Sequence, residues 1–219
     1  MSQTDKILAA VTGGDRETVR SLIEESPQLA NVTSHDGVSM VRLSVYYGQK
    51  EIAEILARSP EIALDIWDSS ALGYLAAVEE ALQGVGGDEA LNAYSRDGYT
   101  PLQLACFFGH EEVAELLIAR GADVRAVSKN PTAIQPIHAA TAGNNLIIVR
   151  LLLGAGADPN AAQQNGFRPL HAAAQNENVP MVRLLFECGA DPALTDARGQ
   201  TPRQLAEEIG DSEIIMLLS

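Results

Sequence analysis

Apolar and polar positions along the chain follow the pattern of paired short helices. The clearest copy is the stretch from Asp97 to Asp123, D-G-Y-T-P-L-Q-L-A-C-F-F-G-H-E-E-V-A-E-L-L-I-A-R-G-A-D. Its first half carries an apolar run, and in its second half Val113, Leu116 and Leu117 recur at helical spacing between charged residues. The pattern predicts a turn, a short helix, a tight loop and a second helix.

The ends of both predicted helices carry the expected signals. Gly98 is suited to a turn, because glycine reaches positive φ without a Cβ penalty. Thr100 can cap the first helix, and Pro101 at its first position loses nothing by lacking an N–H group. Gly109 and Gly121 end the two helices. Two helices this short cannot bury their apolar faces on each other alone, so the unit needs neighbours.

The same unit recurs along most of the chain. Taking the residue in the loop between the helices as a marker, successive copies are separated by 34, 25, 36, 35, 33 and 33 residues, by subtraction of the marker numbers. The longer step to the fifth copy is absorbed in residues 127–132, for which we expect an extended loop. The markers are Gly14, Gly48, Gly73, Gly109, Asn144, Glu177 and Gly210.

The repeated letters resemble the ankyrin-repeat family, whose period is about 33 residues. Four copies are similar to its T-P-L-H motif: Thr100-Pro101-Leu102-Gln103, Gln135-Pro136-Ile137-His138, Arg168-Pro169-Leu170-His171 and Thr201-Pro202-Arg203-Gln204. Three copies are similar to its G-A-D motif: Gly121-Ala122-Asp123, Gly156-Ala157-Asp158 and Gly189-Ala190-Asp191. The chain also resembles bacterial stand-alone ankyrin proteins, through L-D-I-W-D-S-S-A-L-G at residues 64–73.

The resemblance implies an all-α fold, an ankyrin-repeat α-solenoid of about seven helix-turn-helix modules joined by hairpin-like loops. We expect one array over residues 1–219, in which each module contacts only its neighbours. The expected modules are 5–33 as N-terminal cap, 34–63, an irregular 64–95, 96–128, 129–162, 163–195, and 196–219 as C-terminal cap.

The third module is the irregular one. Its step of 25 residues indicates that the usual hairpin is missing after Pro60. We expect helices over 64–72 and 75–83, and then a long, loose connection at 84–87 before Leu91. This interpretation places an internal boundary there, with two modules before it and five after it, and a hinge as an alternative to a rigid superhelix.

Charge narrows the classes of partner. The formal net charge of −14 argues against nucleic acid and against an anionic membrane. The simpler explanation of this charge is an acidic surface that is solvated by water, and the more specific one is a partner protein with a basic surface.

The sequence shows no sign of export or of a membrane span. No secretory signal is visible, and the longest apolar run is too short to span a bilayer. Cys106 and Cys188 are expected to be too far apart for a disulfide. We therefore expect a cytoplasmic monomer.

Candidate chemistry is sparse. His138 and His171 both occupy the histidine position of T-P-L-H, which in the family is a structural one. At ~10 Å apart they could not share a metal ion. The possible acid pairs, Asp65 with Asp68 and Glu79 with Glu80, are expected to be solvated carboxylates. We predict no enzyme, no catalytic residues, no metal site and no cofactor.

The large side chains outside the framework positions are the candidates for binding. In the family the binding face is concave and is built from the loop tips and the inner helices. Aromatic residues mapped there are typical of interface hot spots. The alternative is that one residue of each aromatic pair packs between modules. The candidates are Tyr46, Tyr47, Trp67, Tyr99, Phe107, Phe108, Ile134 and Phe167, with a polar flank at Gln164, Asn165, Arg168, Gln175 and Asn176.

Two functions of different classes follow from this pattern. The main hypothesis is a non-catalytic protein-protein interaction module, an adaptor, inhibitor or scaffold that binds another protein on its concave face. The alternative is a small-molecule or metabolite receptor with a pocket near the irregular third module, around Trp67.

Overall fold

The chain folds into pairs of antiparallel helices. The structure is a computed structural model that describes residues 2–84 and 86–219, and those residues form no β-strand, only an isolated antiparallel bridge between Thr33 and Ser39. The seven helix pairs are α1 Gln3–Gly13 with α2 Arg16–Glu25, α3 Met40–Tyr46 with α4 Lys50–Ala57, α5 Ile66–Leu72 with α6 Leu75–Gln83, α8 Pro101–Phe108 with α9 Glu111–Ala119, α10 Pro136–Ala142 with α11 Leu146–Gly154, α12 Pro169–Gln175 with α13 Val179–Glu187, and α14 Pro202–Ile209 with α15 Ser212–Leu217; three short helices, η1 Pro27–Asn31, α7 Gly87–Leu91 and η2 Gln164–Gly166, lie in the connections.

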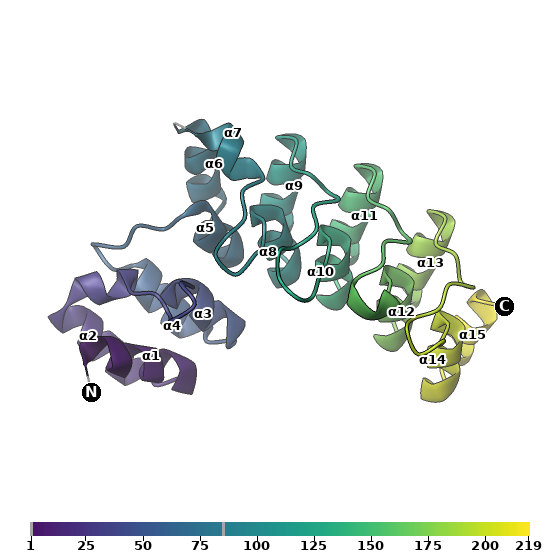
Figure 1. The fold of residues 1–219 in the computed structure, drawn as a ribbon, viewed down its shortest axis with the longest axis horizontal. Coiled ribbons are helices and arrows are strands. Elements are labelled where there is room, and N and C mark those ends of the chain that lie inside the picture. The colour runs from purple at the N-terminus through teal and green to yellow at the C-terminus, as the bar shows by residue number, and fades with distance from the viewer. Residues whose placement is uncertain (1, 85) are drawn as a thin grey trace.

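The pairs stack into a solenoid (Figure 1). The first helices of successive pairs, α8, α10, α12 and α14, pack side by side as an inner row, and α9, α11, α13 and α15 form an outer row. Loops that project to one side join each outer helix to the next inner one (Figure 1). The predicted α-solenoid is confirmed.

Local sequence explains where the helices begin and end. In α8, Thr100 Oγ1 accepts a hydrogen bond from the backbone N–H of Gln103 (3.3 Å), and Gln103 Oε1 accepts one from that of Thr100 (2.8 Å). This reciprocal capping box satisfies two free N–H groups. Pro101 follows at the first helical position. The predicted loop markers all have positive φ, between 53° and 89°, namely Gly14, Gly48, Gly73, Gly109, Asn144, Glu177 and Gly210.

The third module differs in detail from the prediction. Helix α5 begins at Ile66 rather than Leu64, because the side chain of Asp65 caps it by accepting from the N–H of Asp68 at 2.6 Å. The expected loose connection at 84–87 is shorter than predicted, since α7 already begins at Gly87. Val85, within that connection, lies outside the described residues.

The buried core divides into two clusters. One is built from α1 to α4, with Ile7, Met40 and Leu56 at its centre, and the other runs from Ile66 in α5 to Leu218. The division falls at the predicted boundary between the first two modules and the rest. Across it the inner helices α3 and α5 pack together, whereas the outer helices α4 and α6 hardly touch. That this boundary acts as a hinge stays a prediction.

In the fourth, fifth and sixth modules, a polar side chain of the inner helix binds the loop that leads to the next module. Gln103 donates to two backbone carbonyls in the loop of the fifth module (2.9 and 2.8 Å). His138 Nε2 lies 2.9 Å from the carbonyl oxygen of Ala161, and His171 Nε2 lies 3.0 Å from that of Gln200. Burial lowers the pKa of both histidines, which favours the neutral ring. The structural role predicted for these histidines is confirmed.

At the boundary an ionic network takes the place of this contact. Arg42 occupies the same helix position, but the third module has no projecting loop for it to reach. Its Nε lies 3.7 Å from Asp68 Oδ1 and 3.9 Å from Asp97 Oδ1, and its side chain is only 3% exposed. Ser39 Oγ donates to Asp68 at 2.6 Å. Asp68 is buried, so the expectation that it is a solvated carboxylate was wrong, because the missing loop leaves Arg42 to pair with it. Asp97 belongs to the loop of the fourth module, so the second module contacts the fourth directly.

The network contains two carboxylates and one guanidinium. The pKa of Asp68 is raised to about 6, first by burial and then by the neighbouring charges of Asp65 and Asp97. The hydrogen bond from Ser39 and the charge of Arg42 act in the opposite direction but are outweighed. At neutral pH the Asp68 carboxylate is ionised in both the folded and the unfolded chain. The charge costs more free energy in the folded chain, so it lowers the stability of the fold.

This imbalance predicts how stability depends on pH. Because the pKa of Asp68 is raised in the folded chain, its contribution is present below the ordinary value of 3.8 and is lost as pH rises through about 6. Relative to Asp68→Asn, the wild-type chain should lose ~2 kcal/mol of unfolding free energy between about pH 4.5 and about pH 7.5. Urea unfolding at about pH 4.5 and about pH 7.5 measures the difference. Glu80→Gln, which removes an exposed carboxylate, is the control; parallel profiles for wild type and Asp68→Asn would contradict the prediction.

Close contact between neighbouring loops gives a second prediction. Gly98 has φ +83°, and a Cβ there would lie 2.8 Å from the carbonyl carbon of Lys129. Gly121 has φ +89° with no atom within 4 Å of such a Cβ. Gly121→Ala should therefore cost about 1 kcal/mol of unfolding free energy from backbone strain alone. Gly98→Ala should cost about 1–3 kcal/mol more, because the two loops must move apart. Equal losses in urea unfolding would show that the loops do not constrain each other.

Candidate protein-binding groove

A cavity opens on the face formed by the loops and the inner helices. It has a volume of about 380 Å³, and three of the predicted aromatic residues, Tyr46, Tyr99 and Phe107, line it together. They come from α3, from the loop of the fourth module and from α8. We call it the first cavity. Its lining residues are Val38, Tyr46, Asp97, Tyr99, Gln103, Leu104, Phe107, Asn130, Pro131 and Thr132.

The extended loop of the fifth module forms one wall of the first cavity. Ser128 Oγ and Thr132 Oγ1 both donate to Asn130 Oδ1 (3.0 and 2.5 Å), and the Asn130 amide donates to the carbonyl of Asp97 (3.0 Å). These bonds hold the loop in a defined shape against the loop before it. The two extra residues predicted from the sequence spacing thus belong to a structured wall.

A second cavity of about 310 Å³ continues along the same face. It shares Tyr99, Phe107 and Thr132 with the first cavity, and Ile134, another predicted residue, lies buried in its wall. Its far side carries side-chain amides, which can donate to and accept from a peptide backbone. We call the two cavities together the groove. The amides are those of Gln163, Gln164 and Asn165.

Asp97 is the one acidic side chain in the lining of the first cavity. Its carboxylate accepts hydrogen bonds from the hydroxyl of Tyr46 and from Ser95 Oγ, the latter at 2.6 Å. Burial, and then the hydrogen bond to Asp97, raise the pKa of Tyr46, so its hydroxyl stays protonated and acts as a donor. The first cavity is therefore largely apolar, with a single fixed carboxylate.

The remaining aromatic candidates divide between packing and exposure. The Phe108 ring lies 5.8 Å from that of Tyr46 and 5.1 Å from that of Phe107, between centroids, so it supports both from behind. Tyr47 is 54% exposed. In the Phe107–Phe108 pair, Phe107 is the more exposed residue, at 48%, and Phe108 is partly buried, as the packing alternative predicts for one member of each pair.

The other candidates lie outside the groove. Trp67 packs against the larger core cluster, and its indole N–H donates to the carbonyl of Ala93 at 3.0 Å. Phe167 stacks near His171, with ring centroids 5.2 Å apart. Arg168 donates to the carbonyl oxygens of Gly166 and Thr195, both at 2.7 Å, and Asn176 donates to that of Thr141 at 3.1 Å, whereas Gln175 is exposed.

Asp97, Pro131 and Thr132 line the groove but are absent from the predicted set. Asp97 has the sequence signal of a turn residue, and nothing local distinguishes it from the turn aspartates of other modules. The two loop residues could have been found, because the step to the fifth loop marker is two residues longer than the 33 of the following steps.

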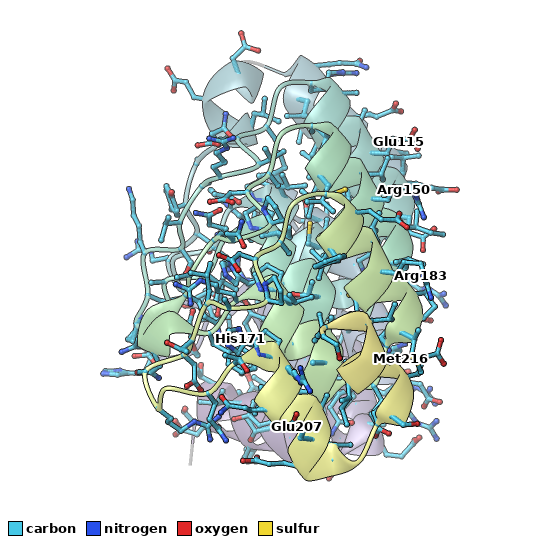
Figure 2. All side chains as sticks on the ribbon, turned by 90° about the vertical axis from the view of Figure 1, so that its right-hand side faces the viewer. Glu115, Arg150, His171, Arg183, Glu207 and Met216 are labelled. Carbon is cyan, nitrogen blue, oxygen red and sulfur yellow. The ribbon has the colours of Figure 1, made fainter. Side chains whose placement is uncertain are left out.

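The opposite face is charged. Figure 2 shows Glu115, Arg150 and Arg183 one above another on the outer helices α9, α11 and α13, pointing away from the body of the solenoid. Within residues 2–84 and 86–219, no helix is long and apolar enough to cross a membrane, and no three His, Cys, Asp or Glu side chains gather as metal ligands.

Acidic charge is unevenly distributed along the solenoid. Seven acidic residues and no Lys or Arg lie between Arg58 and Arg96, so this stretch alone contributes −7 to the formal net charge of −14. They are Glu61, Asp65, Asp68, Glu79, Glu80, Asp88 and Glu89.

Known proteins share the repeats of this chain. It is 36% identical over 95 residues to the human BCL-6 corepressor-like protein 1, covering 43% of this chain and 5% of that protein. It is 27% identical over 157 residues to the E3 ubiquitin-protein ligase KEG of Arabidopsis thaliana, covering 72% of this chain and 8% of that protein. It is 42% identical over 81 residues to a putative ankyrin repeat-containing protein of Treponema pallidum, covering 36% of this chain and 27% of that protein. The chain thus spans less than a third of the length of each of these relatives.

The model of the ankyrin repeats, in three copies, matches residues 7–128 and 125–196. These ranges cover most of the chain and coincide with the stacked helix pairs. The chain belongs to the ankyrin-repeat family.

Proposed function

We propose that this chain is a non-catalytic protein-binding module, an adaptor, inhibitor or scaffold, that receives an exposed segment of a partner protein in the groove. The observation that carries the proposal is the convergence of Tyr46, Tyr99, Phe107 and Ile134 on two adjoining cavities. Proteins of this family are generally interaction modules. The groove joins aromatic anchors to amides that can bind a peptide backbone, as peptide-binding surfaces do.

The rigidity of the groove favours this function. Its walls are inner helices and loops whose backbone groups are hydrogen-bonded to neighbouring modules, as in the bond from the Lys129 N–H to the carbonyl of Gly98 (2.8 Å). A preformed surface loses little conformational entropy when a partner binds. The partner therefore bears most of the ordering cost, which suits an exposed, extended segment.

The alternative of a metabolite receptor in the third module has less support. It depends on Trp67, whose indole N–H is already bonded to a backbone carbonyl and whose ring packs on the core. A cavity does lie at that module, between Leu72, Tyr74, Phe108 and residues of α4, but its volume of about 200 Å³ is below the ~300 Å³ typical of small-molecule sites.

Phe107 provides the test, since it lines both cavities and is 48% exposed. Phe107→Ser should weaken binding of a co-purifying partner at least about tenfold, as expected for a hot-spot aromatic residue. The partner is purified with the wild-type chain from the native host, identified by mass spectrometry and then titrated against each variant. Circular dichroism should show unchanged helical content.

Phe186→Ser is the matched control. Phe186 is 47% exposed, so the same change removes the same ring from a comparably exposed position, but on the outer helix α13. Its affinity for the partner should equal that of the wild type. Equal loss in both variants, or loss in Phe186→Ser alone, would place binding elsewhere than the groove.

A further inference from the structure

The first cavity combines aromatic rings with a carboxylate. The rings of Tyr46, Tyr99 and Phe107 line it, and Asp97 is the one charged side chain among its lining residues. Aromatic faces attract cations through their quadrupole, most strongly where water is excluded. A carboxylate beside them adds a directed acceptor for a cationic donor. This set of groups suits an organic cation rather than a purely aliphatic side chain.

The charge of Asp97 is only partly neutralised within the protein. Arg42 lies 3.9 Å from Asp97 Oδ1, but it also lies 3.7 Å from Asp68 Oδ1 and is shared between the two carboxylates. The described hydrogen bonds to Asp97 come from the two hydroxyls of Tyr46 and Ser95, whereas a carboxylate offers about four acceptor positions. Asp97 therefore has both excess charge and spare acceptor capacity.

The two side-chain amides of the cavity are already engaged. The amide of Gln103 bonds to Thr100 N and to the carbonyls of Ala126 and Ile134. The Asn130 amide donates to the carbonyl of Asp97. Neither amide group is placed to compensate an incoming charge, so Asp97 decides which charge the cavity accepts.

The net charge of the third module has the same sign. The adjoining stretch from residue 59 to residue 95 carries −7 and no basic side chain. A field of this kind attracts cationic segments and speeds their encounter with the groove. Because the basic residues Arg96 and Lys129 directly precede the lining residues Asp97 and Asn130, the complementarity lies at Asp97 itself, and the module adds only its net charge.

We propose that the first cavity receives an arginine side chain from the partner's exposed segment, with the guanidinium stacked on the aromatic rings and donating to Asp97. This rests on the proposed function of the groove. A planar guanidinium stacks on rings and presents donors in a fork, which the ammonium of lysine does not. A leucine or phenylalanine side chain would instead cover the Asp97 carboxylate without a partner, which costs free energy. Residues next to the arginine in the segment meet the amides of the second cavity.

The experiment is a selection from a random peptide library on the immobilised full chain, followed by titration of synthetic peptides in solution. Enriched peptides should share one arginine. Replacing that arginine by citrulline, which keeps the shape and removes the charge, should weaken binding at least about tenfold. On the variants Asp97→Asn and Phe107→Ala this arginine-to-citrulline difference should shrink several-fold. On Phe186→Ala it should be the same as on the wild type.

Phe107→Ala keeps the test decisive if Asp97→Asn disturbs the fold, because Phe107 is exposed and outside the ionic network. Enriched peptides with an aliphatic or aromatic anchor, or with a lysine that binds as well as arginine, would overturn the arginine assignment. If the binding of such peptides still depends on Phe107, the proposed function of the groove stands without the arginine assignment. Peptide binding that depends on neither Phe107 nor Asp97, or no enrichment of peptides, would overturn the arginine proposal. The proposed function of the groove would then be decided by the titration of the co-purified partner against Phe107→Ser and Phe186→Ser.

Discussion

The solenoid depends on one recurring contact, in which a buried polar side chain at the start of each inner helix binds the backbone of the next module's loop. Gln103, His138 and His171 make this contact in the regular part of the chain. Each side chain hydrogen-bonds a backbone carbonyl oxygen between packed modules. An unpaired polar group in such a place would cost free energy. The third module has no projecting loop, so the contact cannot form there. Much of what is particular to this protein follows from that absence.

Without that loop, Arg42 meets carboxylates instead of carbonyls, and the loops of the second and fourth modules become neighbours. The hydrophobic core divides at the same place, because the outer helices α4 and α6 lie apart and the boundary is bridged mainly by inner helices and the ionic network. The first cavity lies across this boundary. Tyr46 reaches it from one side, and Tyr99 and Phe107 reach it from the other.

A buried ionic network is a weak source of stability but a strong source of local charge. Here it fixes the orientation of Asp97 through Tyr46 and Ser95 and leaves that carboxylate incompletely neutralised. The binding face thereby acquires one directed acidic group in an otherwise apolar and amide-lined groove. This acidic group is the basis of the proposal that the groove selects its partner by charge.

The sequence by itself determined the repeat, its register and its caps. Thr100, Pro101 and the loop markers impose local backbone geometry, and the apolar spacing imposes stacking, so these features could be predicted without a structure. It also determined that Tyr99 and Phe107 exceed what the framework requires. Only the tertiary structure decided that these two rings meet Tyr46, that Trp67 and Arg168 serve packing, and that Asp97 lines the groove. The reason is physical: a missing loop changes which modules touch, and contacts between residues some fifty positions apart, such as Tyr46 with Asp97, are not encoded in local spacing.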